Sequence, residues 1–159
     1  MVYVTRRTTF SASHRLYNPL LSDADNERIF DKCNNPNGHG HNYVLEVTVC
    51  GVPDPLTGYV LDLKRLRDII EEHIIEKVDH RHLNEDVDFL RGIIPTAENL
   101  AWAFWQILEQ KIPSGRLYSI RVYESENNFV EYRGEPIDVP RYLVSTTTTL
   151  HDDDEILQR

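Results

Sequence analysis

The sequence predicts one α+β domain whose elements follow the order strand, strand, helix, helix, strand, strand. Two segments near the N-terminus and two within residues 117–133 alternate apolar and polar residues, as half-buried strands do. Between them, two segments repeat apolar residues at spacings of three and four, which is typical of amphipathic helices. The 159 residues, 40% of them hydrophobic, suit one domain with a sizeable core. We expect that domain to span residues 1–135, and residues 136–159 to form a polar, weakly ordered tail.

The first two predicted strands continue their apolar rows with histidines. In residues 2–16 the row runs through Phe10, Ala12 and His14 to Leu16. The second strand, about residues 41–51, and the residues just before it put these six on one face: His39, His41, Tyr43, Leu45, Val47 and Val49. A single histidine in such a row is commonly a packed core residue, and a metal ligand is the alternative. The residues between the strands, 17–38, predict a long polar loop.

The two predicted helices each begin at a capping residue. Asp62 precedes the first and Thr96 the second. Their apolar stripes are Leu63, Leu66, Ile69, Ile70 and Ile74, then Leu100, Ala101, Phe104, Ile107 and Leu108. A strand over 117–123 places Tyr118, Ile120 and Val122 on one side, with Glu124 continuing that side, and residues 129–133 predict the last strand.

The stretch from Cys33 to Tyr43 holds a thiol and two imidazoles. His39 and His41 lie at i and i+2, so on a strand they leave one face with Cα atoms roughly 6.5 to 7 Å apart. The turn before them could fold Cys33 back towards them. With His14 they make three ligands, and three protein ligands are typical of catalytic zinc, which keeps an open position. A closed structural site completed by Cys33 remains the alternative.

Three further polar residues are candidates for chemistry. Asp79 beside His80 could hold a protonated imidazole that activates a thiol, although histidines at a helix end also complement its dipole. Glu124 ends an apolar strand face, where an acid is costly unless it binds donors; a solvated strand-end acid is the alternative. His73, His82 and His151 are assigned structural or tail positions.

Composition excludes several classes of protein. A net charge of −9 argues against a nucleic-acid or anionic-membrane surface. The sequence contains two cysteines, too few for a disulfide framework, and its first residues lack an apolar signal core. We therefore expect a cytoplasmic protein.

Five motifs together resemble one enzyme family. They are Phe10-Ser-Ala-Ser-His14-Arg-Leu16, Cys33-Asn-Asn-Pro-Asn-Gly-His39-Gly-His41-Asn-Tyr43, Val78-Asp79-His80, Thr96-Ala-Glu98-Asn99 and Tyr123-Glu124-Ser-Glu-Asn-Asn128. Over roughly residues 4–135 the sequence is similar to the 6-pyruvoyl-tetrahydropterin synthase and 6-carboxy-tetrahydropterin synthase family. The five residues between Cys33 and His39 favour the pyruvoyl branch, because the carboxy branch has a shorter gap.

The resemblance implies a role for each motif residue. His14, His39 and His41 would bind Zn²⁺, Cys33 would be the proton-transfer base, and Asp79 and His80 would form a relay with it. Glu124 would anchor the pterin, with Thr96 and Glu98 lining its pocket. Ala97 stands where a second threonine is common in the family.

The resemblance also implies a fold, a reaction and an assembly. The fold would be the tunnelling fold, a four-stranded antiparallel sheet with two helices on one face, assembling through barrel closure into a hexamer, a dimer of trimers. The enzyme would be a carbon–oxygen lyase that converts 7,8-dihydroneopterin triphosphate to 6-pyruvoyl-tetrahydropterin and releases triphosphate. The alternatives are a 6-carboxy-tetrahydropterin synthase of deazapurine (queuosine) biosynthesis and a non-catalytic, zinc-stabilised pterin-binding module.

Overall fold

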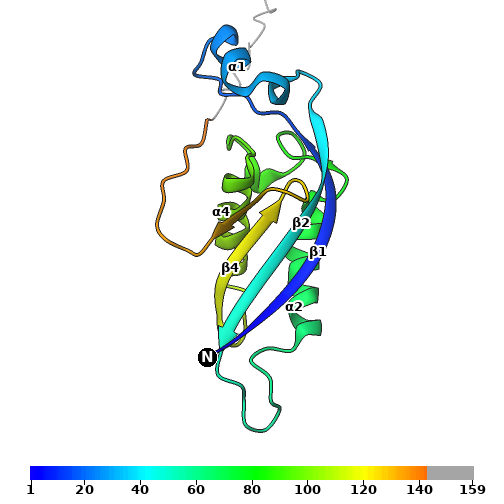
Figure 1. Cartoon of the computed structure of the whole chain (residues 1–159), viewed down its shortest axis with the longest axis vertical. Coiled ribbons are helices and arrows are strands. Elements are labelled where there is room, and N and C mark those ends of the chain that lie inside the picture. Colours follow the sequence, from blue (N-terminus) through cyan, green and yellow to red (C-terminus); the bar gives the residue numbers. More distant parts are fainter. Residues whose placement is uncertain (143–159) are drawn as a thin grey trace, which may run out of the picture.

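The computed structural model describes residues 1–142, so predictions that fall on residues 143–159, His151 among them, lie outside the described part. The elements, several of which are labelled in Figure 1, follow this order: β1 (Val2–His14), α1 (Asp23–Phe30), a 3₁₀ turn (Asp31–Asn34), β2 (His39–Gly51), α2 (Leu63–Ile70), a π-helical turn (Glu71–Ile75), α3 (Glu76–Val78), β3 (Arg81–His82), a 3₁₀ turn (Asp88–Leu90), α4 (Ala97–Leu108), β4 (Arg116–Tyr123) and β5 (Phe129–Tyr132).

The sheet has five strands in the order β3-β1-β2-β4-β5. The neighbours from β1 to β5 pair antiparallel, as predicted, whereas β3 pairs parallel to β1 and only at Ala12 and Ser13. The prediction of a four-stranded antiparallel sheet is therefore wrong in one respect: the sheet has a fifth, short strand, β3, which pairs parallel to β1. β3 was missed because a strand of two residues is too short to show an alternating pattern.

The helices α2 and α4 lie behind one face of the sheet in Figure 1. The alternation of the strands turns their apolar rows towards these helices, which fills the core between the two layers. The largest fully buried side chains come from both layers: Tyr43, Leu45, Leu66, Ile69, Ile70, Ile74, Leu83, Leu90, Leu100, Phe104, Leu108 and Ile120. The buried faces predicted for β1 and β2 are confirmed, including the buried His14.

Both predicted helix caps are confirmed. The side chain of Asp62 accepts a hydrogen bond from the Lys64 backbone N–H at 2.9 Å, and Thr96 Oγ1 accepts one from the Asn99 backbone N–H at 3.3 Å. Leu63 was placed in the buried stripe, but it is the first residue of α2 and 46% exposed. That stripe therefore begins at Leu66.

Two further expectations were wrong. The loop predicted over 17–38 contains α1, whose only buried residue is Asn26. Because the amide nitrogen of Asn26 donates to the carbonyls of Asn18, Leu21 and Ser22, α1 is held by polar contacts and has no apolar stripe to read. Tyr118 was predicted to share a face with Ile120 and Val122, but it lies at a register shift between β2 and β4. Its ring packs on Tyr3, on the sheet face away from the helices, whereas Ile120 and Val122 are buried.

Among residues 1–142, none of the helices combines the length and the apolar character that crossing a membrane requires. Beyond β5, residues 136–142 run along one side of the molecule, drawn in orange in Figure 1.

Candidate active site

Three imidazoles meet where β1 ends and β2 begins. The strand pairing sets His14 directly opposite His39 and Ala12 opposite His41, so the three side chains emerge on the helix-facing side of adjacent strands. One ring nitrogen from each lies within 4.8 Å of the others, and the Nε2 atoms of His14 and His39 are 3.0 Å apart. The convergence predicted for these three residues is therefore present.

The hydrogen bond of His14 to a backbone carbonyl fixes its tautomer and leaves a lone pair on Nε2, the nitrogen that lies 3.0 Å from His39 Nε2. A carbonyl oxygen can only accept, so the 2.8 Å contact of Nδ1 with the Pro95 carbonyl means that Nδ1 carries the proton and Nε2 a lone pair. Burial lowers the pKa of His14 to about 4, opposed by the Pro95 hydrogen bond and reinforced by His39 and His41. The ring is therefore neutral near pH 7, the form that ligates metal.

The spacing of the donors fits a small divalent cation. Zinc bound tetrahedrally at about 2.0 to 2.1 Å from each imidazole nitrogen separates the nitrogens by about 3.3 Å. The ring nitrogens here bracket that value, from 3.0 Å to within 4.8 Å. In addition, the buried Nδ1 of His39 has no hydrogen-bond partner among the described residues. Burial, then the charge of His41, lowers the pKa of His39, which also favours a neutral ligand.

Glu124 stands at the edge of the three-histidine cluster, directly after β4. Its Oε1 is 3.9 Å from His14 Nε2, and its side chain is 33% exposed. Burial raises the pKa of Glu124, His41 opposes this shift and Glu98 reinforces it. Thr96 caps α4 one residue beyond Pro95, so the N-terminus of α4 adjoins the same region.

The 3₁₀ turn that carries Cys33 is tied to the end of β1. The Leu16 N–H donates to the Cys33 carbonyl at 2.8 Å, and the Arg15 guanidinium donates to the carbonyl and side-chain oxygens of Asn34. Cys33 is a free, half-buried thiol. Burial raises the pKa of Tyr43, and Glu124 and then Cys33 reinforce this shift.

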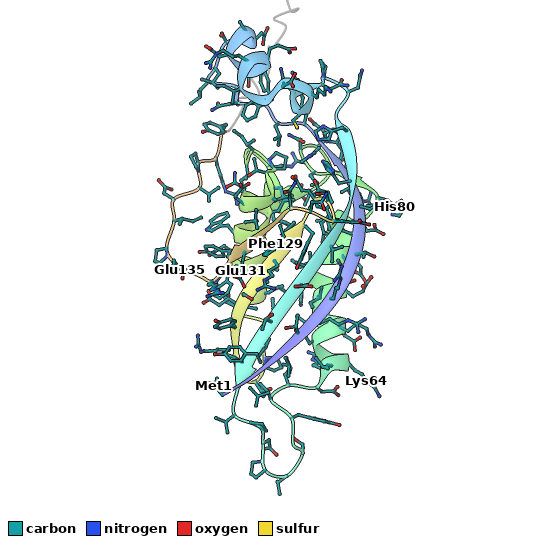
Figure 2. All side chains as sticks on the ribbon, viewed as in Figure 1. Met1, Lys64, His80, Phe129, Glu131 and Glu135 are labelled. Atoms are coloured by element: carbon teal, nitrogen blue, oxygen red, sulfur yellow. The ribbon has the colours of Figure 1, made fainter. Side chains whose placement is uncertain are left out.

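Asp79 and His80 form a pair at the free edge of β1. Asp79 accepts from the Ser11 N–H at 2.8 Å and pairs with His80 Nδ1 at 2.9 Å, and these contacts, the first being the larger, lower the pKa of Asp79. His80 adopts a φ of 57°, unusual for a residue with a side chain. Its side chain is 82% exposed, and Figure 2 shows it directed away from the sheet edge. Within residues 1–142 neither residue hydrogen-bonds Cys33.

Comparison with known proteins identifies the family. A model of the family described as 6-pyruvoyl tetrahydropterin synthase matches residues 3–135. The chain is 50% identical to human 6-pyruvoyl tetrahydrobiopterin synthase over 132 residues, which cover 83% of this chain and 91% of the relative. The Drosophila melanogaster protein of the same name is 43% identical over 135 residues, 84% of this chain and 80% of that protein.

This chain belongs to the 6-pyruvoyl tetrahydropterin synthase family. The solved structure of Caenorhabditis elegans 6-pyruvoyl tetrahydropterin synthase superposes with a TM-score of 0.80 at 40% identity, covering 84% of this chain and 96% of that one. An uncharacterized protein from Wolinella succinogenes has the same fold at 15% identity, with a TM-score of 0.65 over 84% of this chain and 98% of that one.

Two groups around His14 were missed by sequence reasoning. The Pro95 carbonyl is a backbone atom, so no side-chain pattern indicates it. The Tyr43 hydroxyl lies 3.3 Å from His14 Nδ1 in a fully buried position. Tyr43 shares the strand face of His39 and His41, and that shared face was the available signal, but its apolar neighbours suggested packing alone.

Proposed function

We propose that this protein converts 7,8-dihydroneopterin triphosphate to 6-pyruvoyl-tetrahydropterin with release of triphosphate, in a reaction that depends on zinc. The observation that carries the proposal is the meeting of His14, His39 and His41 beside Glu124. A cluster of three imidazoles next to a half-buried acid suits a polar heterocycle whose side chain reaches a cation. The names of the relatives, 6-pyruvoyl tetrahydrobiopterin synthases, support this substrate class.

His14, His39 and His41 would hold the ion through one ring nitrogen each. Bound zinc would supply Lewis acidity, which polarises the side-chain oxygens of the substrate and makes the adjacent C–H bonds more acidic. The protein's contribution is orientation: the Pro95 carbonyl and the Tyr43 hydroxyl fix the ring and tautomer of His14. Three protein ligands leave a coordination position for the substrate.

Cys33 would act as the base that moves protons on the substrate side chain. The tether between the Cys33 carbonyl and Leu16 sets the thiol close to the end of β1, two residues beyond His14. A protonated histidine nearby favours the thiolate. Asp79 would hold His80 in that form, since its carboxylate accepts from the imidazole at 2.9 Å.

Glu124 would accept hydrogen bonds from the pterin ring, with Glu98 and Thr96 lining the same pocket. A half-buried acid suits a ligand that presents N–H donors, because a donor relieves the cost of burying the Glu124 carboxylate. Glu98, which is exposed, would add a second acceptor. Holding the ring at Glu124 would direct the side chain of the substrate towards the histidines 3.9 Å away. This is the orientation that proton transfer by Cys33 requires.

We further propose that the protein is a homo-oligomer, a hexamer built as a dimer of trimers, in the cytoplasm. Among residues 1–142, the outer edge of β1 pairs with a strand only at Ala12 and Ser13, and no helix covers the sheet face that carries Tyr3 and Tyr118. Free edges and open faces favour association. His80 lies beside this edge in Figure 2, and β5, which begins at Phe129, forms the opposite edge of the sheet. The two free thiols suit a reducing compartment.

In this assembly Asp79 and His80 of one subunit serve Cys33 of its neighbour. Cys33→Ala and His80→Ala are therefore each expected to be inactive, while the two variants co-expressed in one cell regain activity in mixed oligomers. Light scattering after size exclusion would report a mass about six times that of one chain. If the mixed oligomers stay as inactive as the parents, the relay operates within one subunit. Co-expression of Cys33→Ala with Cys33→Ser is the control, since it restores no complete site.

The activity itself is tested by incubating pure, zinc-loaded protein with 7,8-dihydroneopterin triphosphate. We expect 6-pyruvoyl-tetrahydropterin and triphosphate, identified by mass, and loss of turnover after chelation. Release of acetaldehyde would instead identify a 6-carboxy-tetrahydropterin synthase. Tight pterin binding without any product would identify a binding module. Either result would overturn the proposal.

A further inference from the structure

Residues 136–142 lie beyond the segment that matches the family, yet both ends of this run are anchored to the domain. The chain leaves β5 through Gly134, which has a φ of +86° and packs so closely on the indole of Trp105 that a Cβ there would clash with it. The Tyr132 hydroxyl then donates to the Glu135 carbonyl at 2.7 Å. These contacts fix where the run begins.

The far end is held by three hydrogen bonds to one loop. Arg141 donates from Nη1 to the Arg91 carbonyl at 3.0 Å and from Nη2 to the Phe89 carbonyl at 3.2 Å. The Tyr142 N–H donates to the Gly92 carbonyl at 2.6 Å. Gly92 has a φ of +75°, and a Cβ there would meet the Tyr142 backbone at 3.1 Å, so the two backbones are in close contact.

This loop leads directly to Pro95, whose carbonyl contacts the three-histidine cluster. The Ile93 N–H donates to the Leu90 carbonyl at 3.0 Å, and the Ile94 carbonyl accepts from the Thr96 N–H at 2.8 Å. Between them, the Pro95 carbonyl accepts from His14 Nδ1. Two residues, Ile93 and Ile94, separate the Gly92 anchor from Pro95. A loop that moves at Gly92 would therefore also move the Pro95 carbonyl, which sets the tautomer of His14.

Tyr142 also borders a pocket of about 210 Å³ behind the end of β1, together with Tyr17, Asn84 and Ile94. Asn84 accepts from the Arg15 N–H and donates to the Arg15 carbonyl, both at 2.9 Å. Asn84, which borders the same pocket as Tyr142, therefore holds the backbone of Arg15, the residue after His14. Pro136 and Pro140 restrict the backbone between the anchors, which lowers the entropy cost of holding it in place.

We propose that residues 136–142 act as a strap that holds residues 89–96 so that the Pro95 carbonyl stays on His14, with Arg141 as the positioning residue. Within residues 1–142, the hydrogen bonds of the Arg141 guanidinium go to the Phe89 and Arg91 carbonyls, so Arg141 would act through the loop. The expected effect of Arg141 on zinc retention rests on the proposed function, whereas its expected effect on the order of residues 89–96 does not.

Hydrogen–deuterium exchange in the full-length Arg141→Ala variant tests the strap. We expect the amides of Ile93, Ile94 and Thr96 to exchange at least about tenfold faster than in the wild type, with β2 unchanged. Release of zinc to a chelator is expected to be about three- to tenfold faster, as a loosened outer-shell partner of a ligand predicts. Arg141→Lys, which can still reach one carbonyl, should fall between the two.

Arg28→Ala is the matched control, because Arg28 is also an exposed arginine in one local contact, with Asp25 on α1. It should leave exchange and zinc release unchanged. Equal exchange of residues 89–96 in Arg141→Ala and the wild type would overturn the proposal, as would faster exchange with unchanged zinc release. Hydrogen exchange and zinc release can both be measured on a protein that shows no enzymatic turnover. A failure of the strap proposal can therefore be distinguished from a failure of the proposed activity.

Discussion

Cys33→Ala is expected to lower kcat by about 10²- to 10⁴-fold, the range that general acid–base groups contribute. The fold should persist, because Cys33 is half-buried on a 3₁₀ turn and the contacts that hold this turn come from its backbone and from Asn34. Zinc should also remain bound with wild-type stoichiometry, because His14, His39 and His41 are sufficient to hold it. Turnover with the triphosphate substrate and metal content by elemental analysis are measured on the same preparation.

The alternative of a closed site makes the opposite prediction for the metal. If the Cys33 sulfur were a fourth ligand, Cys33→Ala would release zinc together with activity. Cys33→Ser sharpens the distinction, since a hydroxyl keeps the size of the side chain but is a far weaker base than a thiolate. Cys50→Ala is the matched control thiol, because Cys50 is fully buried in β2, away from the cluster, and should change stability without changing the metal content.

The sequence could predict which residues share a face, and this was enough to find the cluster. Because side chains alternate between the two faces of a strand, His14 lies on the same face as Phe10 and Ala12, and His39 and His41 lie on the same face as Tyr43. The sequence could not predict the register, that is, which residues of β1 and β2 lie opposite one another. The pairing that sets His14 against His39 depends on which residues of two distant segments meet, and a slip by one residue would separate the rings.

The errors arose where the local pattern is weak or interrupted. Tyr118 continues an alternating row in the sequence, but the shift between Thr48 and Val49 in the partner strand turns it to the other face. The helix α1 buries an asparagine in place of an apolar stripe. The strap is held through backbone carbonyls and Tyr142, contacts that a pattern of side chains does not reveal.

The arrangement of Asp79 and His80 follows from the short strand that the sequence did not indicate. β3 begins directly after His80, and its pairing with β1 holds the His80 N–H 2.6 Å from the Ser11 carbonyl. The positive φ of His80 then turns its side chain outward, where it is largely exposed. The relay that we propose for Asp79 and His80 would be exposed to solvent at a sheet edge of an isolated subunit, which supports the proposal that it serves a neighbouring one.

His14→Ala is expected to weaken zinc binding by more than about 100-fold, since loss of a direct ligand exceeds the 10- to 100-fold cost of losing an outer-shell partner. Activity should fall with the metal and should not return at moderate zinc concentrations. Zinc affinity is measured by competition with a chromophoric chelator. Because His14 is 1% exposed, its truncation also opens a cavity beside Tyr43, so the fold of the variant is checked by circular dichroism.

Two further substitutions separate metal loss from unfolding. His39→Ala removes a ligand that is only partly buried, so it should release zinc at little cost in metal-free stability. His73→Ala, in the π-helical turn between α2 and α3, should leave zinc bound because its ring lies outside the cluster. Wild-type zinc affinity in both His14→Ala and His39→Ala would show that these imidazoles hold no ion.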